Sequence, residues 1–399
     1  MTQLSDRRLI WHLSLIGFFA IFSTTISKNP VLPLFAQATG ADETIIGLIS
    51  SVSPIAGMLF SFPIGFLSDR IGRRGLLIIS GFVFLIAPLC YIAVLHPLWL
   101  IPVRFFHGTA TAILGPVIPA MIAERFPETK GEKIGLYSSA TLVGRALAPM
   151  VGGVILTLFI TAPGYFRYYN VYLCATIAAI PVLLLILITK LDEGALSGGV
   201  SMATFKSSFL TFCADTHLRA TAFVEMAIYC AFGSFETFVP VILEAKGIDT
   251  YLTGIIFAAQ VLVIAGTKPF FGRMADRVDK RVQIAGGLLF LGLPVGLISF
   301  CSSFPQFLLL SLVIGFGMSL STVATSAYIA DLSKKGEIGA SMGALSSIMD
   351  IGHSSGPLLT GIIITVAGYT LGFAISSIVA IGITMVFIAS VWNSTEKTG

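Results

Sequence analysis

The chain has 399 residues, of which 55% are hydrophobic and only 11% are charged. Soluble domains carry about 25% charged residues, so this composition excludes a soluble protein and indicates one that crosses a membrane several times. The net charge of +4 is small and lies in the loops, so it indicates orientation rather than a nucleic-acid partner, and the five scattered cysteines show no disulfide or metal-site spacing.

Twelve apolar segments of about 20 residues or more predict twelve membrane-spanning helices. Only helices and closed barrels satisfy the backbone in lipid, and a barrel would need alternating rather than continuous apolar runs. The first segment is too long for a signal peptide and lacks a cleavage site, so we expect it to remain as a span. The segments lie at about 10–35, 44–68, 75–94, 98–123, 133–160, 168–189, 215–242, 251–275, 282–300, 304–330, 338–366 and 369–392.

The basic residues predict the orientation of these helices. Roughly 18 of the 24 lysines and arginines fall in the termini and the loops on their side, and about two fall in the opposite loops. Both termini should therefore be cytoplasmic, in a multi-pass protein of the cytoplasmic (inner) membrane. The longest polar stretch, 190–214, is predicted to be a cytoplasmic linker between two six-helix bundles, 1–189 and 215–399.

The two halves repeat each other. A constant offset of 207 residues carries Pro33 to Pro240, Gly47 to Gly254 and Asp69 to Asp276, and an offset of 208 carries Gly144 to Gly352 and Pro149 to Pro357. Glycine and proline matches at one offset over the whole length indicate a duplicated six-helix unit.

A charged stretch between the second and third segments carries a known pattern. Residues 65–77 match G-x-x-x-D-R-x-G-R-[RK], and the stretch resembles the loop between helices 2 and 3 of the major facilitator superfamily. The resemblance implies an all-α major facilitator fold with 12 transmembrane helices in two pseudo-symmetric six-helix bundles. An ordinary basic loop retained for topology is the alternative. The residues expected to gate conformational change are Gly65, Asp69, Arg70 and Arg73, with Asp276 and Arg277 in the second copy.

The fifth segment carries a second pattern. Its residues match G-x8-G-x3-G-P-x2-G-G with one alanine in place of glycine, which resembles the motif of the drug:proton antiporters of this superfamily. Such a stripe of small residues permits close packing of helices, and the proline bends the helix. Packing alone, without a transport role, is the other interpretation. The expected helix-packing residues are Gly144, Ala148, Pro149, Gly152 and Gly153, preceded by Gly135.

Charged residues inside the spans are the candidates for function, because burying a charge in a bilayer is costly. Arg104 and Gly108 resemble the family's R-x-x-x-G element, often proposed to take part in proton transfer, and we expect Arg104 to face a cavity rather than snorkel to the interface. Glu236 is the first choice for proton coupling because it should lie within reach of Lys28; Glu225 and Asp350 follow. Structural ion pairs are the alternative, favoured for Lys268. The expected substrate-cavity residues are Lys28, Asn29, Arg104, Arg145 and His353.

The sequence shows no nucleotide-binding loop, catalytic triad or metal cluster, so neither an enzyme nor a cofactor is predicted. We expect a secondary transporter, acting as a monomer in the lipid bilayer, that exports small amphipathic or drug-like compounds by proton antiport with alternating access. A proton-coupled symporter or a facilitator importing a small organic anion is the alternative, since basic residues exceed acidic ones in the spans. A non-transporting membrane receptor would not need the buried acids.

Overall fold

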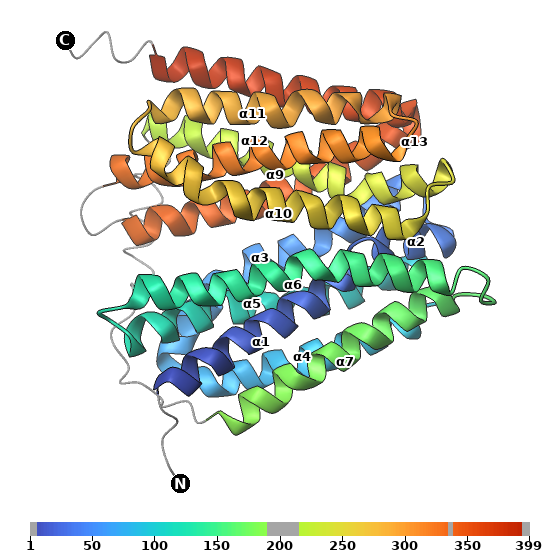
Figure 1. Ribbon diagram of the computed structural model, residues 1–399, viewed down its shortest axis with the longest axis horizontal. Coiled ribbons are helices and arrows are strands. Elements are labelled where there is room, and N and C mark those ends of the chain that lie inside the picture. Colours follow the sequence, from blue (N-terminus) through green and yellow to red (C-terminus); the bar gives the residue numbers. More distant parts are fainter. Residues whose placement is uncertain (1–5, 190–214, 334–337, 393–399) are drawn as a thin grey trace. The chain divides into compact units, whose positions relative to one another are not determined.

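The computed structural model describes residues 6–189, 215–333 and 338–392, and they form an all-helical protein (Figure 1). The side chains of Phe62, 65–71, 338–340 and Trp392 lie outside this description. The helices of the first half are α1 (Asp6–Ile26), α2 (Val31–Ala38), α3 (Glu43–Ile71), α4 (Arg73–Ile92), α5 (Leu100–Arg125), α6 (Lys130–Leu158) and α7 (Phe166–Ile188). Those of the second half are α9 (Thr216–Ala245), α10 (Thr250–Ala275), α11 (Lys280–Leu297), α12 (Phe304–Leu332) and α13 (Ile338–Trp392), and short 3₁₀ turns occur at η1 (Pro97–Trp99) and η2 (Ile298–Phe300).

The described helices confirm the predicted membrane spans. Eleven are long and apolar enough to cross a bilayer, and the last, α13, contains two spans because its backbone leaves the helical conformation at Gly368 (φ 81°, ψ 168°). Only glycine adopts such a conformation without strain, so Gly368 sets the corner between the two spans. The first predicted span is interrupted by a turn before α2, where Pro30 cannot donate a backbone hydrogen bond.

Two compact units make up the chain. The first unit consists of Met1–Ala41, Val52–Gly199 and Asp249–Ala258, and the second unit consists of Asp42–Ser51, Val200–Ile248 and Ala259–Gly399. The beginning of α3 therefore belongs to the second unit and the beginning of α10 to the first. The predicted linker 190–214 lies outside the described residues.

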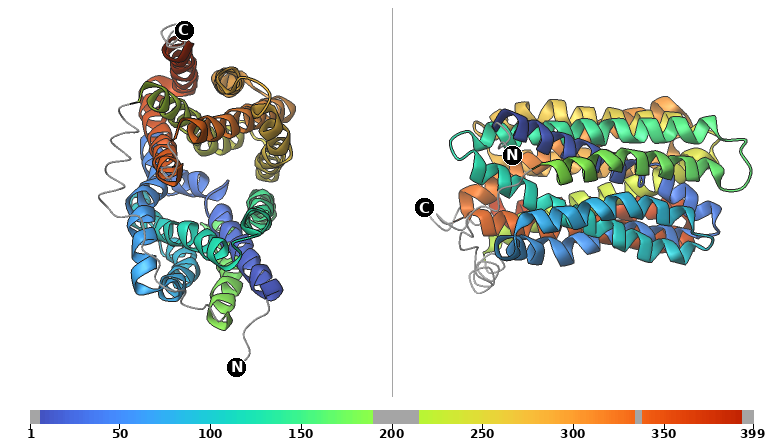
Figure 2. Two further views of the ribbon diagram at one scale, coloured as in Figure 1. Left: turned by 90° about the vertical axis from the view of Figure 1, so that its left-hand side faces the viewer. Right: turned by 90° about the horizontal axis from the view of Figure 1, so that it is seen from below.

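Each unit is a bundle of helices packed side by side (Figure 2). In the first unit, α1 packs on α6 and α7, and α4 packs on α5 and α7. In the second unit, α9 packs on α13, and α11 packs on α12 and α13. The interior of the first unit is apolar, with Leu77, Phe84 and Ile186 fully buried. This close packing holds the few polar side chains of the bundle at defined positions.

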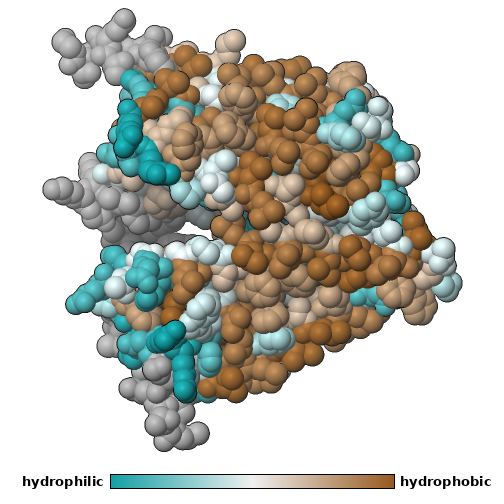
Figure 3. All heavy atoms as spheres, viewed as in Figure 1, coloured by the Kyte–Doolittle hydropathy of each residue, from teal (hydrophilic) through white to brown (hydrophobic). Residues whose placement is uncertain are grey.

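Large apolar side chains are also exposed on the outer surface. Ile177 on α7 is 65% exposed, and Val366 and Met385 on α13 are 83% and 67% exposed. Figure 3 shows hydrophobic colouring along the helices and hydrophilic colouring near their ends. Water would not tolerate apolar surface on this scale, whereas lipid would, so the protein is a multi-pass membrane protein.

The beginnings of α3 and α10, each of which belongs to the other unit than the rest of its helix, are here called the swapped ends. They make equivalent contacts. A Cβ added to Gly47 would lie 2.2 Å from the carbonyl oxygen of Pro357, and one added to Gly254 would lie 2.4 Å from that of Pro149. Offsets of 207 and 208 residues turn one contact into the other. Only glycine allows backbones to approach this closely, so the repeat seen in the sequence is also a repeat of backbone contacts.

Hydrogen bonds follow the same symmetry. The backbone amide of Thr44 donates to Oγ1 of Thr365, and the amide of Tyr251 donates to Oγ1 of Thr157, both at 3.1 Å. These amides lie in the first turns of α3 and α10, where a helix has no partner for its own N–H groups. In each unit, the hydroxyl oxygen of a threonine on a neighbouring helix therefore accepts a hydrogen bond from a backbone N–H group that has no partner within its own helix.

Candidate functional site

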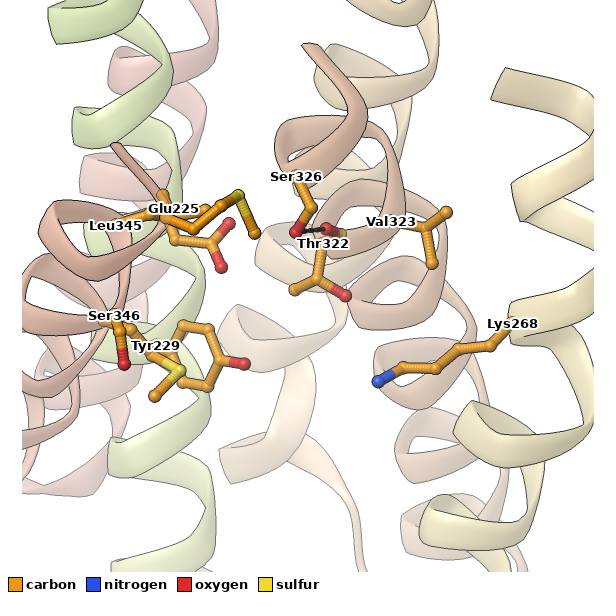
Figure 4. A pocket seen from close by; sticks show the side chains of 10 residues that line it. Glu225, Tyr229, Lys268, Thr322, Val323, Ser326, Leu345 and Ser346 are labelled. Atoms are coloured by element: carbon orange, nitrogen blue, oxygen red, sulfur yellow. Dashed lines mark hydrogen bonds between the residues drawn. The ribbon is translucent and has the colours of Figure 1, made fainter. Parts of the chain in front are cut away.

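A polar pocket opens among four helices of the second unit (Figure 4). Its volume is about 390 Å³, within the range of small-molecule sites. We call it the Glu225 pocket. Its polar lining comes from Glu225 and Tyr229 on α9, Lys268 on α10, Thr322 and Ser326 on α12 and Ser346 on α13, and its apolar lining comes from Val323, Met342, Leu345 and Met349.

Glu225 is held inside the bundle by a threonine. Only 4% of its surface is exposed, and Oγ1 of Thr325 lies 2.7 Å from its Oε2. The same Oγ1 lies 3.0 Å from the carbonyl oxygen of Thr322. The single hydroxyl proton of Thr325 can therefore be donated to Glu225 or to the Thr322 carbonyl, one at a time.

Lys268 approaches the Glu225 pocket from the opposite side. Figure 4 shows its ammonium group pointing inward from α10 while the carboxyl group of Glu225 points inward from α9. The pocket thus carries an acid on one wall and an ammonium group on the other.

A second acid lies farther along α9. Oε2 of Glu236 is 2.9 Å from Nε2 of His353 on α13, and both side chains are mostly buried, at 13% and 18% exposure. The ring of His353 lies 6.0 Å from that of Tyr229, which also lines the Glu225 pocket. His353 is therefore one partner of Glu236; the pairing with Lys28, a residue of the first unit, stays a prediction.

The first unit buries a cation instead of an acid. Arg104 on α5 is only 2% exposed, so it does not snorkel to a surface of this unit. Its Nη1 donates to the hydroxyl of Tyr91 at 3.4 Å, and that hydroxyl lies 3.4 Å from Nδ1 of His107. Tyr91 also stacks on Tyr172, with ring centroids 4.4 Å apart. The guanidinium is thus enclosed by aromatic and imidazole groups within the first unit.

The remaining candidates do not line the Glu225 pocket. Asp350 on α13 is half-buried, Arg145 on α6 is exposed, and Asn29 is buried in the turn before α2. Within the described residues, no group of three or more histidine, cysteine, aspartate or glutamate side chains could hold a metal ion.

The predicted gating residues are placed only in part. Arg73 forms a bidentate ion pair with Glu124 on α5, with Nη1 2.6 Å from Oε2. Asp276 and Arg277 are exposed between α10 and α11. The side chains of Gly65, Asp69 and Arg70 lie outside the described residues, so their gating role stays a prediction.

The predicted packing stripe of α6 lies against α1. A Cβ added to Gly144 would lie 2.6 Å from the carbonyl oxygen of Phe18, and one added to Gly152 would lie 3.2 Å from the side chain of Ile26. Ala148 is fully buried. Gly153, one residue off the stripe, faces the carbonyl of Thr250 at 2.5 Å instead.

Sequence reasoning missed part of the Glu225 pocket. Thr322, Thr325 and Ser326 follow an i, i+3, i+4 spacing, which gives the apolar helix α12 one polar face, and this signal could have been found. A structural ion pair was the favoured interpretation of Lys268, and it stays a prediction; that Lys268 lines the pocket could not be foreseen, because sequence alone does not show toward which neighbour a side chain points.

Comparisons with known proteins agree with this architecture. The sequence model of the Major Facilitator Superfamily matches residues 13–218 and 221–399. An uncharacterized MFS-type transporter of Methanocaldococcus jannaschii is 25% identical over 383 residues, 91% of this chain and 95% of that one. A homolog of the multi-drug resistance efflux pump PmrA, from Lactococcus lactis subsp. lactis, is 24% identical over 364 residues, 89% of this chain and 87% of that one.

Solved structures show the same fold. A bacterial homolog of the human lysosomal transporter Spinster shares only 15% identity, yet it superposes with a TM-score of 0.79 over 98% of this chain and 96% of that one. These relatives are transporters rather than enzymes. With nearly the whole length matched by the family model, this chain belongs to the major facilitator superfamily.

Proposed function

We propose that this transporter exports small amphipathic or drug-like compounds across the cytoplasmic membrane in exchange for protons, with alternating access. Its resemblance to a multidrug efflux pump homolog supports the substrate class. The excess of lysine and arginine near the termini supports cytoplasmic termini. The single observation that carries proton exchange is the hydrogen bonding of Glu225 beside a pocket.

Glu225 can be accommodated in both protonation states. As a carboxylate, it accepts the hydrogen bond from Thr325 at 2.7 Å. As a carboxylic acid, it donates to the same Oγ1, and Thr325 then donates to the carbonyl of Thr322 at 3.0 Å. Neither state leaves a buried polar group unsatisfied, which is what a group that binds and releases protons requires.

The position of Glu225 at a pocket allows a substrate and a proton to be exchanged at one carboxyl group. A cationic group of a substrate that enters the pocket would contact the carboxylate that otherwise holds the proton, so substrate and proton compete for one group. Alternating access then releases each on the opposite side of the membrane. This geometry shifts our first choice for the proton-coupling acid from Glu236 to Glu225, and the Glu236–His353 pair becomes second.

Reconstitution into proteoliposomes with an imposed pH gradient tests the proposal. Wild-type protein should concentrate rhodamine 123, a lipophilic cation, against its gradient. Glu225→Gln should lose this uphill transport and keep exchange in the absence of a pH gradient, because glutamine mimics a permanently protonated carboxyl group. Glu244→Gln changes a half-buried acid near the end of the same helix that does not line the Glu225 pocket; it is the matched control and should behave as wild type.

The remaining outcomes are equally decisive. Loss of uphill transport in Glu236→Gln but not in Glu225→Gln would place the coupling at the Glu236–His353 pair. If Glu225→Gln, Glu236→Gln and Asp350→Asn all keep pH-driven transport, coupling through these carboxyl groups is wrong. Import of a small organic anion, by facilitated transport or by symport with protons, would then replace proton antiport as the proposed function. The ammonium group of Lys268 in the pocket favours anion import as this second candidate.

A further inference from the structure

The Glu225 pocket places opposite charges on opposite walls. Glu225 on α9 and Lys268 on α10 both line it and point into it (Figure 4). A pocket that served only cations would have no need for an ammonium group on its wall. A pocket that served only anions would have no need for a buried carboxyl group.

The lining between these charges is apolar and adaptable. Met342, Leu345 and Met349 on α13 face the pocket, and Tyr229 adds an aromatic ring. Methionine side chains adjust to differently shaped partners, and an aromatic ring packs against flat or cationic groups. The pocket therefore combines two fixed charges with a surface that tolerates variation in the body of a ligand.

We propose that this pocket selects zwitterionic amphipathic compounds, whose cationic group contacts Glu225 and whose carboxylate contacts Lys268. The inference rests on the proposed function, since it names the substrate class of the same site. A zwitterion meets both walls with opposite charge and adds no net charge to the pocket. A pure cation would face Lys268, and a pure anion would face Glu225, so each would meet one repulsive contact.

Three dyes with one xanthene skeleton test this selectivity. Rhodamine 110 carries a cation and a carboxylate, rhodamine 123 is its methyl ester and carries only the cation, and fluorescein carries only negative charge. Binding to purified protein in detergent at pH 8 is measured by fluorescence anisotropy. Wild-type protein should bind rhodamine 110 about tenfold more tightly than either other dye, because unmatched charges in a binding site typically lower affinity by this much or more.

Variants assign each preference to one wall. Lys268→Gln should remove the preference for rhodamine 110 over rhodamine 123, and Lys268→Arg should keep it. Glu225→Gln should remove the preference for rhodamine 110 over fluorescein. Lys246→Gln changes a lysine that follows α9 and does not line the pocket, so it should leave both ratios unchanged.

Wild-type protein that binds all three dyes equally, or does not bind rhodamine 110, overturns the inference without any variant. Equal weakening of rhodamine 110 and rhodamine 123 in Lys268→Gln also overturns it, because Lys268 would then only support the pocket. The assay uses no pH gradient, so its result is separate from that of proton coupling. Selective binding without pH-driven transport would uphold the inference and refute proton antiport.

Discussion

The backbone contacts of the two halves are nearly the same, whereas their buried charges differ. Gly47 meets the carbonyl of Pro357 in the second unit as Gly254 meets that of Pro149 in the first. The charges show no such symmetry. The repeat places Arg104 opposite Ser311, Glu236 opposite Asn29 and Glu225 opposite Phe18.

The difference shows which positions belong to the fold and which to the chemistry. A glycine whose Cβ would lie 2.2–2.4 Å from a carbonyl oxygen cannot be replaced without moving a helix, so duplication preserved it in both copies. A buried charge contributes no packing that an apolar residue could not supply, and it is costly in lipid. Its presence in one copy only is therefore best explained by function.

The largest effect is expected from breaking a repeated contact. Gly254→Leu and Gly47→Leu should each reduce transport to below about one-tenth of wild type, because overpacking against backbone costs about 1–3 kcal/mol or more. Yield of monodisperse protein and transport in proteoliposomes measure the effect. Gly266→Leu is the matched control on α10, since a Cβ there would meet nothing within 4 Å. If one of the two paired variants is tolerated, the contacts are not equivalent.

The stripe on α6 is expected to show a similar effect confined to one unit. Gly144→Leu should abolish transport because its side chain would enter the backbone of α1, 2.6 Å away at Cβ. Ala148→Gly, which restores the family pattern, should be tolerated apart from a helix-propensity cost of about 1 kcal/mol. Transport assays and thermal stability of the purified variants check both. Full activity of Gly144→Leu would show that close packing at this position is unnecessary.

The sequence was sufficient for the fold because spans, turns and repeats leave local patterns. Apolar runs marked the helices, and glycine and proline at one offset marked the duplication. The swapped ends of α3 and α10 were not foreseen, since they depend on contacts between segments about 100 to 300 residues apart. The site was less predictable: Glu225 and Glu236 are both acids of one helix, and only the positions of Thr325 and His353 distinguish them.

A smaller effect is expected at the predicted gating residues. We expect the carboxylate of Asp69, near the end of α3, to face the N-terminus of another helix, where a carboxylate contributes about 0.3–1 kcal/mol. Asp69→Asn should therefore slow transport about two- to fivefold and leave folding intact. Asp276→Asn should be milder, since the second copy has Asp279 where the first has Gly72. Initial transport rates of well-inserted protein measure both variants. Wild-type rates in Asp69→Asn would remove this residue from the gating mechanism.

The smallest effect concerns the starts of α4 and α11, where the two copies of the loop differ. Gly72 precedes α4 with φ at 90° and offers no side chain. Asp279 caps α11: its Oδ1 accepts a hydrogen bond from the backbone amide of Arg281 at 2.9 Å, and its carboxylate pairs with the Arg281 guanidinium. The pKa of Asp279 is lowered, mainly because the Arg281 side chain donates hydrogen bonds to its carboxylate.

A lowered pKa fixes the direction of the pH dependence. The cap stabilises the folded state fully above the ordinary pKa of aspartate, and its contribution is lost as the pH falls through the lowered pKa. Amide hydrogen exchange in the first turn of α11, corrected for intrinsic rates, should therefore be faster in Asp279→Asn than in wild type at pH 7. The two proteins should converge in strong acid, while the first turn of α4 stays unaffected by the substitution. Because Asp279 is 37% exposed, solvent screening keeps the effect small and local. Equal exchange in both proteins at pH 7 would show that the cap does not hold this helix end.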